Sequence, residues 1–160
     1  MALLPHERYS NIVNSLYAYI QTNYSTTQID FQGLATLDTK TITEWIWVGT
    51  DVIGRRNMRQ VTTDPALPRG FSWGNLVTLY LTTIISVKPN TNLLRAYEIR
   101  DILVNLLRRA TITITDYAGG AGAQGRLYGC EIIEESALGV ENDVTRLRVV
   151  FEYKYMENFE

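Results

Sequence analysis

The sequence predicts an α+β fold in which a mainly antiparallel β-sheet packs against two long amphipathic helices. Two stretches, residues 5–24 and 93–110, place apolar side chains three and four positions apart, as on one side of a helix. Several other stretches are rich in β-branched and aromatic residues, and the last of them alternates with polar ones, as in a half-buried strand. The order of helix, strands, helix, strands favours an antiparallel sheet.

Length and composition limit the class of protein. The chain has 160 residues, which suits a single domain over residues 1–160. A net charge of −2 gives no electrostatic reason to bind nucleic acid or an anionic membrane. The single cysteine excludes an intrachain disulfide and a multi-cysteine metal site. With no signal peptide and no apolar run long enough to span a bilayer, we expect a soluble protein made in the cytosol.

The first helix is expected over residues 5–24, with Pro5 in a first turn that tolerates proline. Its apolar stripe consists of Tyr9, Ile12, Val13, Leu16, Ile20 and Tyr24. A loop or short strand should follow around Ile29 and Phe31, and the turn-like "LDTK" ends it.

Residues 41–48, "TITEWIWV", are typical of a strand because they are β-branched and aromatic. Both faces of this strand are largely apolar: Trp45 and Trp47 share one, and Ile42, Ile46 and Val48 share the other. Glycines and prolines punctuate residues 49–75, which we predict to be a long irregular segment.

The clearest buried strand is expected over residues 75–89, where Pro89 ends it. Its buried face would carry Val77, Leu79, Leu81, Ile85 and Val87. Asn90 or Asn92 can then cap the second helix. The apolar stripe of that helix consists of Ala96, Ile99, Ile102, Leu103, Leu106 and Ala110.

The C-terminal part is predicted to be β-rich. A strand over residues 111–115 leads into a glycine-rich loop, residues 117–125, and "RLYGCEII" returns as a strand. "EESALGVEND" is interpreted as an acidic turn before the last strand, residues 144–155. That strand alternates cleanly: Leu147, Val149, Phe151, Tyr153 and Tyr155 face one way, and Arg146, Arg148, Glu152 and Lys154 the other.

The glycine-rich loop contains Gly120, Gly122 and Gly125 at the G-x-G-x-x-G spacing of a dinucleotide-binding turn. Such a turn needs a helix directly after it, because the pyrophosphate sits on the free N–H groups of that helix. The residues that follow, "RLYGCEIIEE", are typical of a strand. We therefore interpret the loop as a long hairpin connection, and expect no nucleotide and no other cofactor.

No set of residues suggests catalysis or a metal site. His6 is the only histidine, which argues against a histidine triad or a two-histidine metal site. Cys130 lies in a strand pattern and is expected to be a small buried hydrophobic residue. The nearby carboxylates lack the spacing of a calcium loop, so we expect a solvated acidic turn; they are Glu131, Glu134, Glu135, Glu141 and Asp143.

The aromatic residues Trp45, Trp47, Phe71 and Trp73 offer more apolar surface than two helices can easily cover. Aromatic residues of this kind are frequent in protein interfaces. Arg55, Arg56 and Arg59 form the one basic cluster, for which phosphate contact, an intersubunit salt bridge and plain solvation all remain open. The candidate interface residues are Trp45, Trp47, Arg55, Arg56, Arg59 and Trp73.

The order of elements also resembles a known family. An amphipathic helix and strands precede "LVTLYLTTIISVKPNTNLLRAYEIRDILVNLLRR", and a β-rich end closes with "TRLRVVFEYKY". This pattern is similar to the tail terminator, tail-completion and head–tail joining (neck) proteins of tailed bacteriophages. The resemblance spans most of the chain and is weak over residues 49–75.

The resemblance implies a ring-forming protomer, commonly in a hexamer, without catalysis or cofactor. The ring would end polymerisation of the tail tube at its capsid-proximal end and join the tail to the neck, with DNA passing through it. Its partners would be further copies, the tail tube protein and a neck protein, in a virion assembled in the bacterial cytoplasm. The resemblance assigns no role to residues 49–75; from its arginines, Arg55, Arg56 and Arg59, we expect that this segment can supply an arm that reaches the acidic 134–143 turn of a neighbour.

Two alternatives stay open. One is another neck component, such as a head-completion or adaptor protein. The other is a small-ligand-binding or enzymatic α+β domain that uses the glycine-rich loop.

Overall fold

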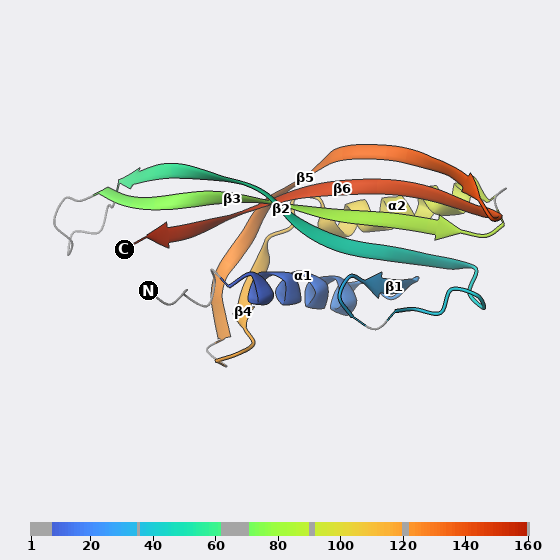
Figure 1. Ribbon diagram of the computed structural model, residues 1–160, viewed down its shortest axis with the longest axis horizontal. Helices are drawn as coiled ribbons and strands as arrows, with labels where there is room; N and C mark the ends of the chain where they lie inside the picture. Colours follow the sequence, from blue (N-terminus) through green and yellow to red (C-terminus); the bar gives the residue numbers. More distant parts are fainter. Residues whose placement is uncertain (1–7, 35, 62–70, 90–91, 120–121, 160) are drawn as a thin grey trace.

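Six strands form one strongly curled sheet in the order β1-β2-β3-β6-β5-β4 (Figure 1). The computed structural model describes the backbone of residues 8–34, 36–61, 71–89, 92–119 and 122–159. It describes side chains within residues 8–34, 36–51, 76–89, 92–119 and 125–155. The elements are α1 (Tyr9–Asn23), β1 (Gln28–Phe31), β2 (Glu44–Val61), β3 (Phe71–Val87), α2 (Leu93–Leu107), β4 (Ile112–Asp116), β5 (Gly122–Glu141) and β6 (Val144–Phe159).

The predicted α+β class is confirmed. Strand β1 runs parallel to β2, and every other neighbouring pair is antiparallel. None of the helices in the described part of the chain is long and apolar enough to cross a membrane.

The hydrophobic core lies between the two helices and one face of the sheet. Alternate residues of β2, β3 and β6 join it, and Leu81, Ile85 and Phe151 are fully buried there. The predicted faces of β3 and β6 are therefore confirmed. Residues one position along each strand lie on the opposite face, which we call the outer face of the sheet.

The predicted stripe of α1 is mostly confirmed, because Ile12, Leu16, Ile20 and Tyr24 are buried, although Tyr9 is 40% exposed. The stripe predicted for α2 is only partly right. Ala96, Ile99 and Leu103 are buried, but Ile102 is exposed, and Val104 and Leu107 are buried instead. The buried line follows 96, 99, 103 and 107, so Ile102 lies to one side of it.

The prediction of an irregular segment over residues 49–75 is wrong. Strand β2 continues to Val61 and pairs with β3 from Phe71 onward, and only residues 62–70 lie outside the described backbone. The register shifts between Val52 and Gly54, as at a β-bulge. A single glycine inside a strand commonly marks such a bulge or a close approach, and need not end the strand.

The prediction of an acidic turn is also wrong in extent. Residues 134–141 belong to β5, which is tied to β6 by a turn at Asn142 and Asp143. Both of these residues have positive φ, 51° and 62°, as a two-residue hairpin turn requires. Asn and Asp tolerate this conformation better than most residues.

One part of the sheet extends past both helices (Figure 1). It consists of residues 52–61 of β2, 71–76 of β3 and 156–159 of β6, which we call the arm. Within the described backbone, β1 ends opposite Val48, so β2 has a neighbouring strand only on its β3 side beyond that point.

Candidate interaction surface on the outer sheet face

Three neighbouring rows of residues run across the strands in the middle of the outer face of the sheet. In the first row, Trp47 of β2 is opposite Ile84 of β3, which is opposite Arg148 of β6. Residues in register across neighbouring strands share a face and contact one another. The next rows, in order, are Gly49, Thr82 and Val150, then Asp51, Tyr80 and Glu152.

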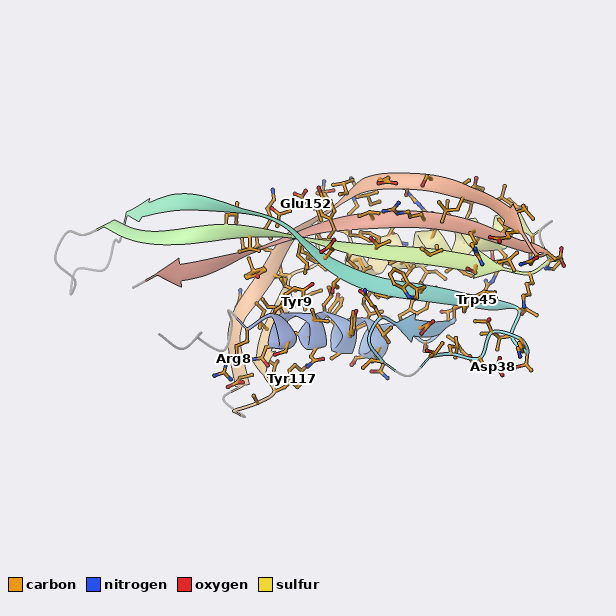
Figure 2. The ribbon with its side chains drawn as sticks, in the orientation of Figure 1. Arg8, Tyr9, Asp38, Trp45, Tyr117 and Glu152 are labelled. Atoms are coloured by element: carbon orange, nitrogen blue, oxygen red, sulfur yellow. The ribbon has the colours of Figure 1, made fainter. Side chains whose placement is uncertain are left out.

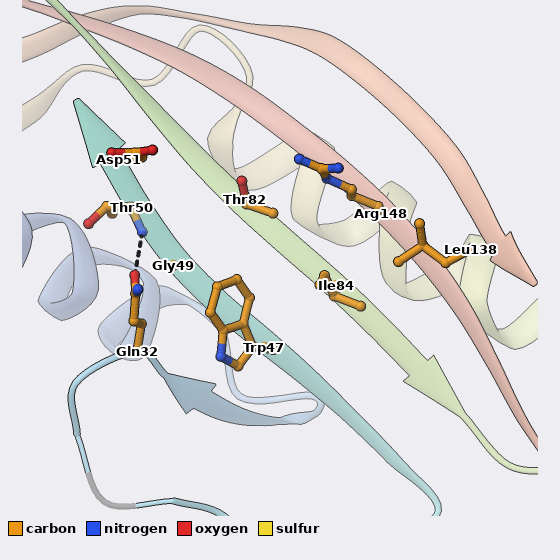
Figure 3. Close-up of a pocket in the computed structure, with 9 residues that line it drawn as sticks. All are labelled: Gln32, Trp47, Gly49, Thr50, Asp51, Thr82, Ile84, Leu138 and Arg148. Carbon is orange, nitrogen blue, oxygen red and sulfur yellow. Dashed lines mark hydrogen bonds between the residues drawn. The ribbon is translucent and has the colours of Figure 1, made fainter. Parts of the chain in front are cut away.

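A hollow of about 510 Å³ opens on this face, where the middle row has small side chains (Figure 3). We call it the trough. Trp47 and Ile84 form its apolar side together with Leu138 of β5, and Asp51 and Arg148 supply its charges. The lining residues are Gln32, Trp47, Gly49, Thr50, Asp51, Thr82, Ile84, Leu138 and Arg148.

Gly49 makes room for the ring of Trp47. A Cβ atom at position 49 would overlap the indole ring and would come within 2.9 Å of Oε1 of Gln32. That Oε1 atom accepts a hydrogen bond from the backbone N–H of Thr50 at 3.2 Å (Figure 3). The indole therefore lies along the strand, half-buried, with part of its surface in the trough.

Arg148 has an unmet donor beside the trough. Its Nε atom is buried and has no hydrogen-bond partner within the structure. Its Nη1 atom lies 3.6 Å from Oε1 of Glu134, which is a loose ion pair between partly exposed groups. A buried N–H group without a partner is unfavourable. The exposed part of the same guanidinium group is held only by this loose pair, so it can take a further acceptor at the trough.

The predicted interface residues do not all lie together. Trp47 lines the trough. Trp45, at the start of β2 and away from the arm (Figure 2), is only 8% exposed. The Nζ atom of Lys88 lies 5.2 Å from the centre of a Trp45 ring and donates a hydrogen bond to Thr39 O, so the chain itself covers part of this ring. The remaining predicted residues, Arg55, Arg56, Arg59 and Trp73, belong to the arm, and their side chains lie outside the described part.

The carboxylates of β5 form ion pairs with arginines of the same chain. Glu131 lies 3.4 Å from Arg108 and 3.7 Å from Arg109, measured between Nε and a carboxylate oxygen. The other pairs are Glu134 with Arg148, Glu135 with Arg100, and Glu141 with Arg146. These carboxylates are spread along a strand, and the described residues contain no group of three or more metal-ligating side chains.

Cys130 is fully buried, as predicted. Burial raises the pKa of its thiol to about 12, so the thiol stays protonated at neutral pH. A protonated, buried thiol is a poor nucleophile. His6 lies outside the described residues.

The start of the glycine-rich loop is fixed by Asp116, a residue that the sequence analysis did not single out. Its carboxylate accepts hydrogen bonds from Gly119 N at 3.0 Å, from Ala118 N at 3.2 Å and from Asn11 Nδ2 of α1 at 3.2 Å. The Gly119 N–H is the largest cause that lowers the pKa of Asp116 below its ordinary value. Arg8 and Tyr117 lie at this same end of α1 (Figure 2).

Two backbone N–H groups of the glycine-rich loop, those of Ala118 and Gly119, thus donate to the carboxylate of Asp116, which directly precedes the loop. Residues 122–125 already belong to β5, so a strand follows where a dinucleotide turn would need a helix. The sequence contains a signal for this turn at Asp116, because an aspartate followed closely by glycine commonly accepts hydrogen bonds from the backbone that follows it.

The fold has a counterpart among solved structures. A chain of the virion of a native gene transfer agent particle matches with a TM-score of 0.54 and 13% identity. The match covers 93% of this chain and 99% of the other. At this identity the likeness shows a shared fold.

A second solved structure matches with a TM-score of 0.45 and 8% identity over 89% of this chain and 94% of the other, too low to carry an argument. No family model and no curated protein matches the chain.

Proposed function

We propose that this protein is a structural component of a phage-like virion. The observation that carries the proposal is the shared fold with a chain of the gene transfer agent virion, which extends over nearly the whole of both chains. The order of elements along the sequence, which resembles that of phage tail proteins, supports the same proposal.

More specifically, we propose a tail terminator that forms a closed ring at the capsid-proximal end of the tail. The bare outer face supports this role, because exposed apolar patches usually mark interaction sites. Trp47, Ile84 and Leu138 leave apolar surface there that neither helix covers. The partners would be further copies in a ring, which we take to be a hexamer, together with the tail tube protein and a neck protein.

The broader proposal is tested by composition. Particles from a producing strain are purified on a density gradient, and the protein is quantified by mass spectrometry. Copies at a fixed small ratio to the major capsid protein support a virion component. Their absence from particles that contain tails and necks would contradict it.

The narrower proposal is tested by position. Purified protein is added to tail tubes assembled without it, and the tube ends are imaged by electron microscopy. We expect a ring on the capsid-proximal end alone. Density on the portal vertex of capsids, with none on tubes, would instead identify another neck component, and density along the tube flank would contradict both.

A further inference from the structure

We infer that the trough receives the arm of a second copy of this chain. This inference rests on the proposed ring and names the two surfaces that would meet in it. Figures 1 and 3 show both surfaces on the one protomer: the trough lies on its body, and the arm extends away from that body.

The shape of the trough suits a narrow segment of chain. Its floor is low because Gly49 and Thr82 lie between two rows of larger side chains. Gln32 and Thr50 stand at the β2 side, where β1 has already ended. A segment can therefore enter from that edge and lie across the strands.

The trough also presents groups that lack partners. Arg148 lines the trough and its side chain is 39% exposed, so its guanidinium group can receive a backbone carbonyl of an extended segment. Asp51 is exposed, and among the residues whose side chains are described it has no ion pair. The nearby Asp30 of β1 is half-buried and has no ion pair there either. An occupant with a carbonyl for Arg148 and a positive charge for Asp51 would meet both needs.

The arm matches these needs in charge. Arg55, Arg56 and Arg59 fall within five residues of its β2 strand. Within the 134–143 segment that was expected to receive them, Glu134, Glu135 and Glu141 already pair with arginines of their own chain. Asp51 and Asp30 are therefore the better acceptors for the arginines of a neighbour.

A protomer cannot fill its own trough in this way. The arm continues β2, β3 and β6 away from the body, and the trough lies on the outer face of the same three strands. The strands would have to fold back on themselves to bring the two together. Contact between two different surfaces of neighbouring copies is head-to-tail, and it closes into a ring when the rotation allows.

The test is site-directed cross-linking in assembled rings. Asp51→Cys is combined in turn with Arg55→Cys, Arg56→Cys or Arg59→Cys, and rings are oxidised with copper phenanthroline. The native Cys130 does not interfere, because it is fully buried. The matched control replaces Asp51→Cys by Glu98→Cys on the exposed side of α2.

We expect at least one Asp51 pair to give a ladder of covalent oligomers on a denaturing gel, and the Glu98 pairs to give none. Rings that form without a ladder from any Asp51 pair, or with equal ladders from the Glu98 pairs, would overturn the inference and leave the ring intact. Failure to form rings at all would count against the proposed function itself.

A second measurement uses charge. Asp51→Arg should weaken ring assembly at least tenfold at low salt, while the melting temperature of the protomer stays unchanged because Asp51 is exposed and unpaired. Ring assembly at the wild-type concentration would contradict the inference.

Discussion

Single residues on the outer face show how backbone and side chains fit together. Gly49 was expected to begin an irregular segment, yet it lies inside β2 directly beneath the Trp47 ring. The absence of a Cβ atom lets the indole lie flat on the sheet. Gly49 has this role because the Trp47 ring lies close to its backbone on the same face of the sheet. A glycine in the sequence does not by itself show that such a close contact is present.

Gly49→Ala should therefore destabilise the protein by roughly 1–3 kcal/mol, as overpacking does, because the new methyl group displaces the indole ring. Urea unfolding followed by circular dichroism measures the loss. The same change in a Trp47→Ala background should cost clearly less, because the overlap with the indole is gone and only the contact with Gln32 Oε1 remains. Equal costs in the two backgrounds would show that the ring does not lie over Gly49.

A second residue-level prediction concerns Asp116. Its pKa is lowered in the folded protein, first by the Gly119 N–H, so the folded state favours the charged carboxylate. Its contribution to stability is complete above the ordinary value of 3.8, and is lost as the pH falls through the lowered folded pKa. Asp116→Asn should thus be less stable than wild type at pH 7, and the difference should shrink below pH 3.8.

Urea unfolding at several pH values checks this, and Asp38→Asn is the control, since Asp38 is exposed. A difference between Asp116→Asn and wild type that stays constant over the acid range would show that the charge of Asp116 is not involved.

At the scale of elements, the alternation along β6 separates core from surface. Phe151 is fully buried, whereas Arg148 lies on the outer face and keeps part of its side chain exposed. Buried residues such as Phe151 hold the strand in the sheet. Outer-face residues such as Arg148 contribute to what the sheet can bind.

Phe151→Ala should cost roughly 3–5 kcal/mol, the usual range for a buried phenylalanine. Arg148→Ala should cost about 0.5 kcal/mol or less, as for most surface positions, because its ion pair is loose and its Nε atom has no partner. Both are measured by chemical unfolding. Comparable losses would mean that the register of β6 is wrong.

For the whole molecule, the decisive feature is that both helices contribute to one core on one face of the sheet. Neighbouring residues of β3 show the consequence. Ile85 is fully buried beneath the helices, and Ile84 is half-buried at the trough. We therefore expect Ile85 to be needed for folding and Ile84 to be needed for assembly.

Ile84→Lys should fold with nearly the wild-type melting temperature but fail to form rings, because the charge would remove an apolar contact between copies. Ile85→Lys should not fold, because it buries an unpaired charge in the core. Circular dichroism and electron microscopy of the two variants check this. Rings from Ile84→Lys at the wild-type concentration would exclude this face as the interface.

The sequence by itself determined the α+β class, the two helices, the buried faces of β3 and β6, and the burial of Cys130. These features depend on local periodicity, because a side chain that alternates every second or every third to fourth residue must point to one side of its own element. Such patterns can be read without knowing which other segment lies opposite.

Only the tertiary structure decided the length of β2, β3 and β5, the arginine partners of the β5 carboxylates, and the trough. In the sequence, the glycines at 49 and 54 suggest a break in regular structure. In the fold, β2 stays paired with β3 at both positions, so the strand continues past them. Glu135 reaches Arg100 across 35 positions, and the trough joins residues from Gln32 to Arg148. Contacts between segments so far apart are set by the register of the sheet, which no local pattern contains.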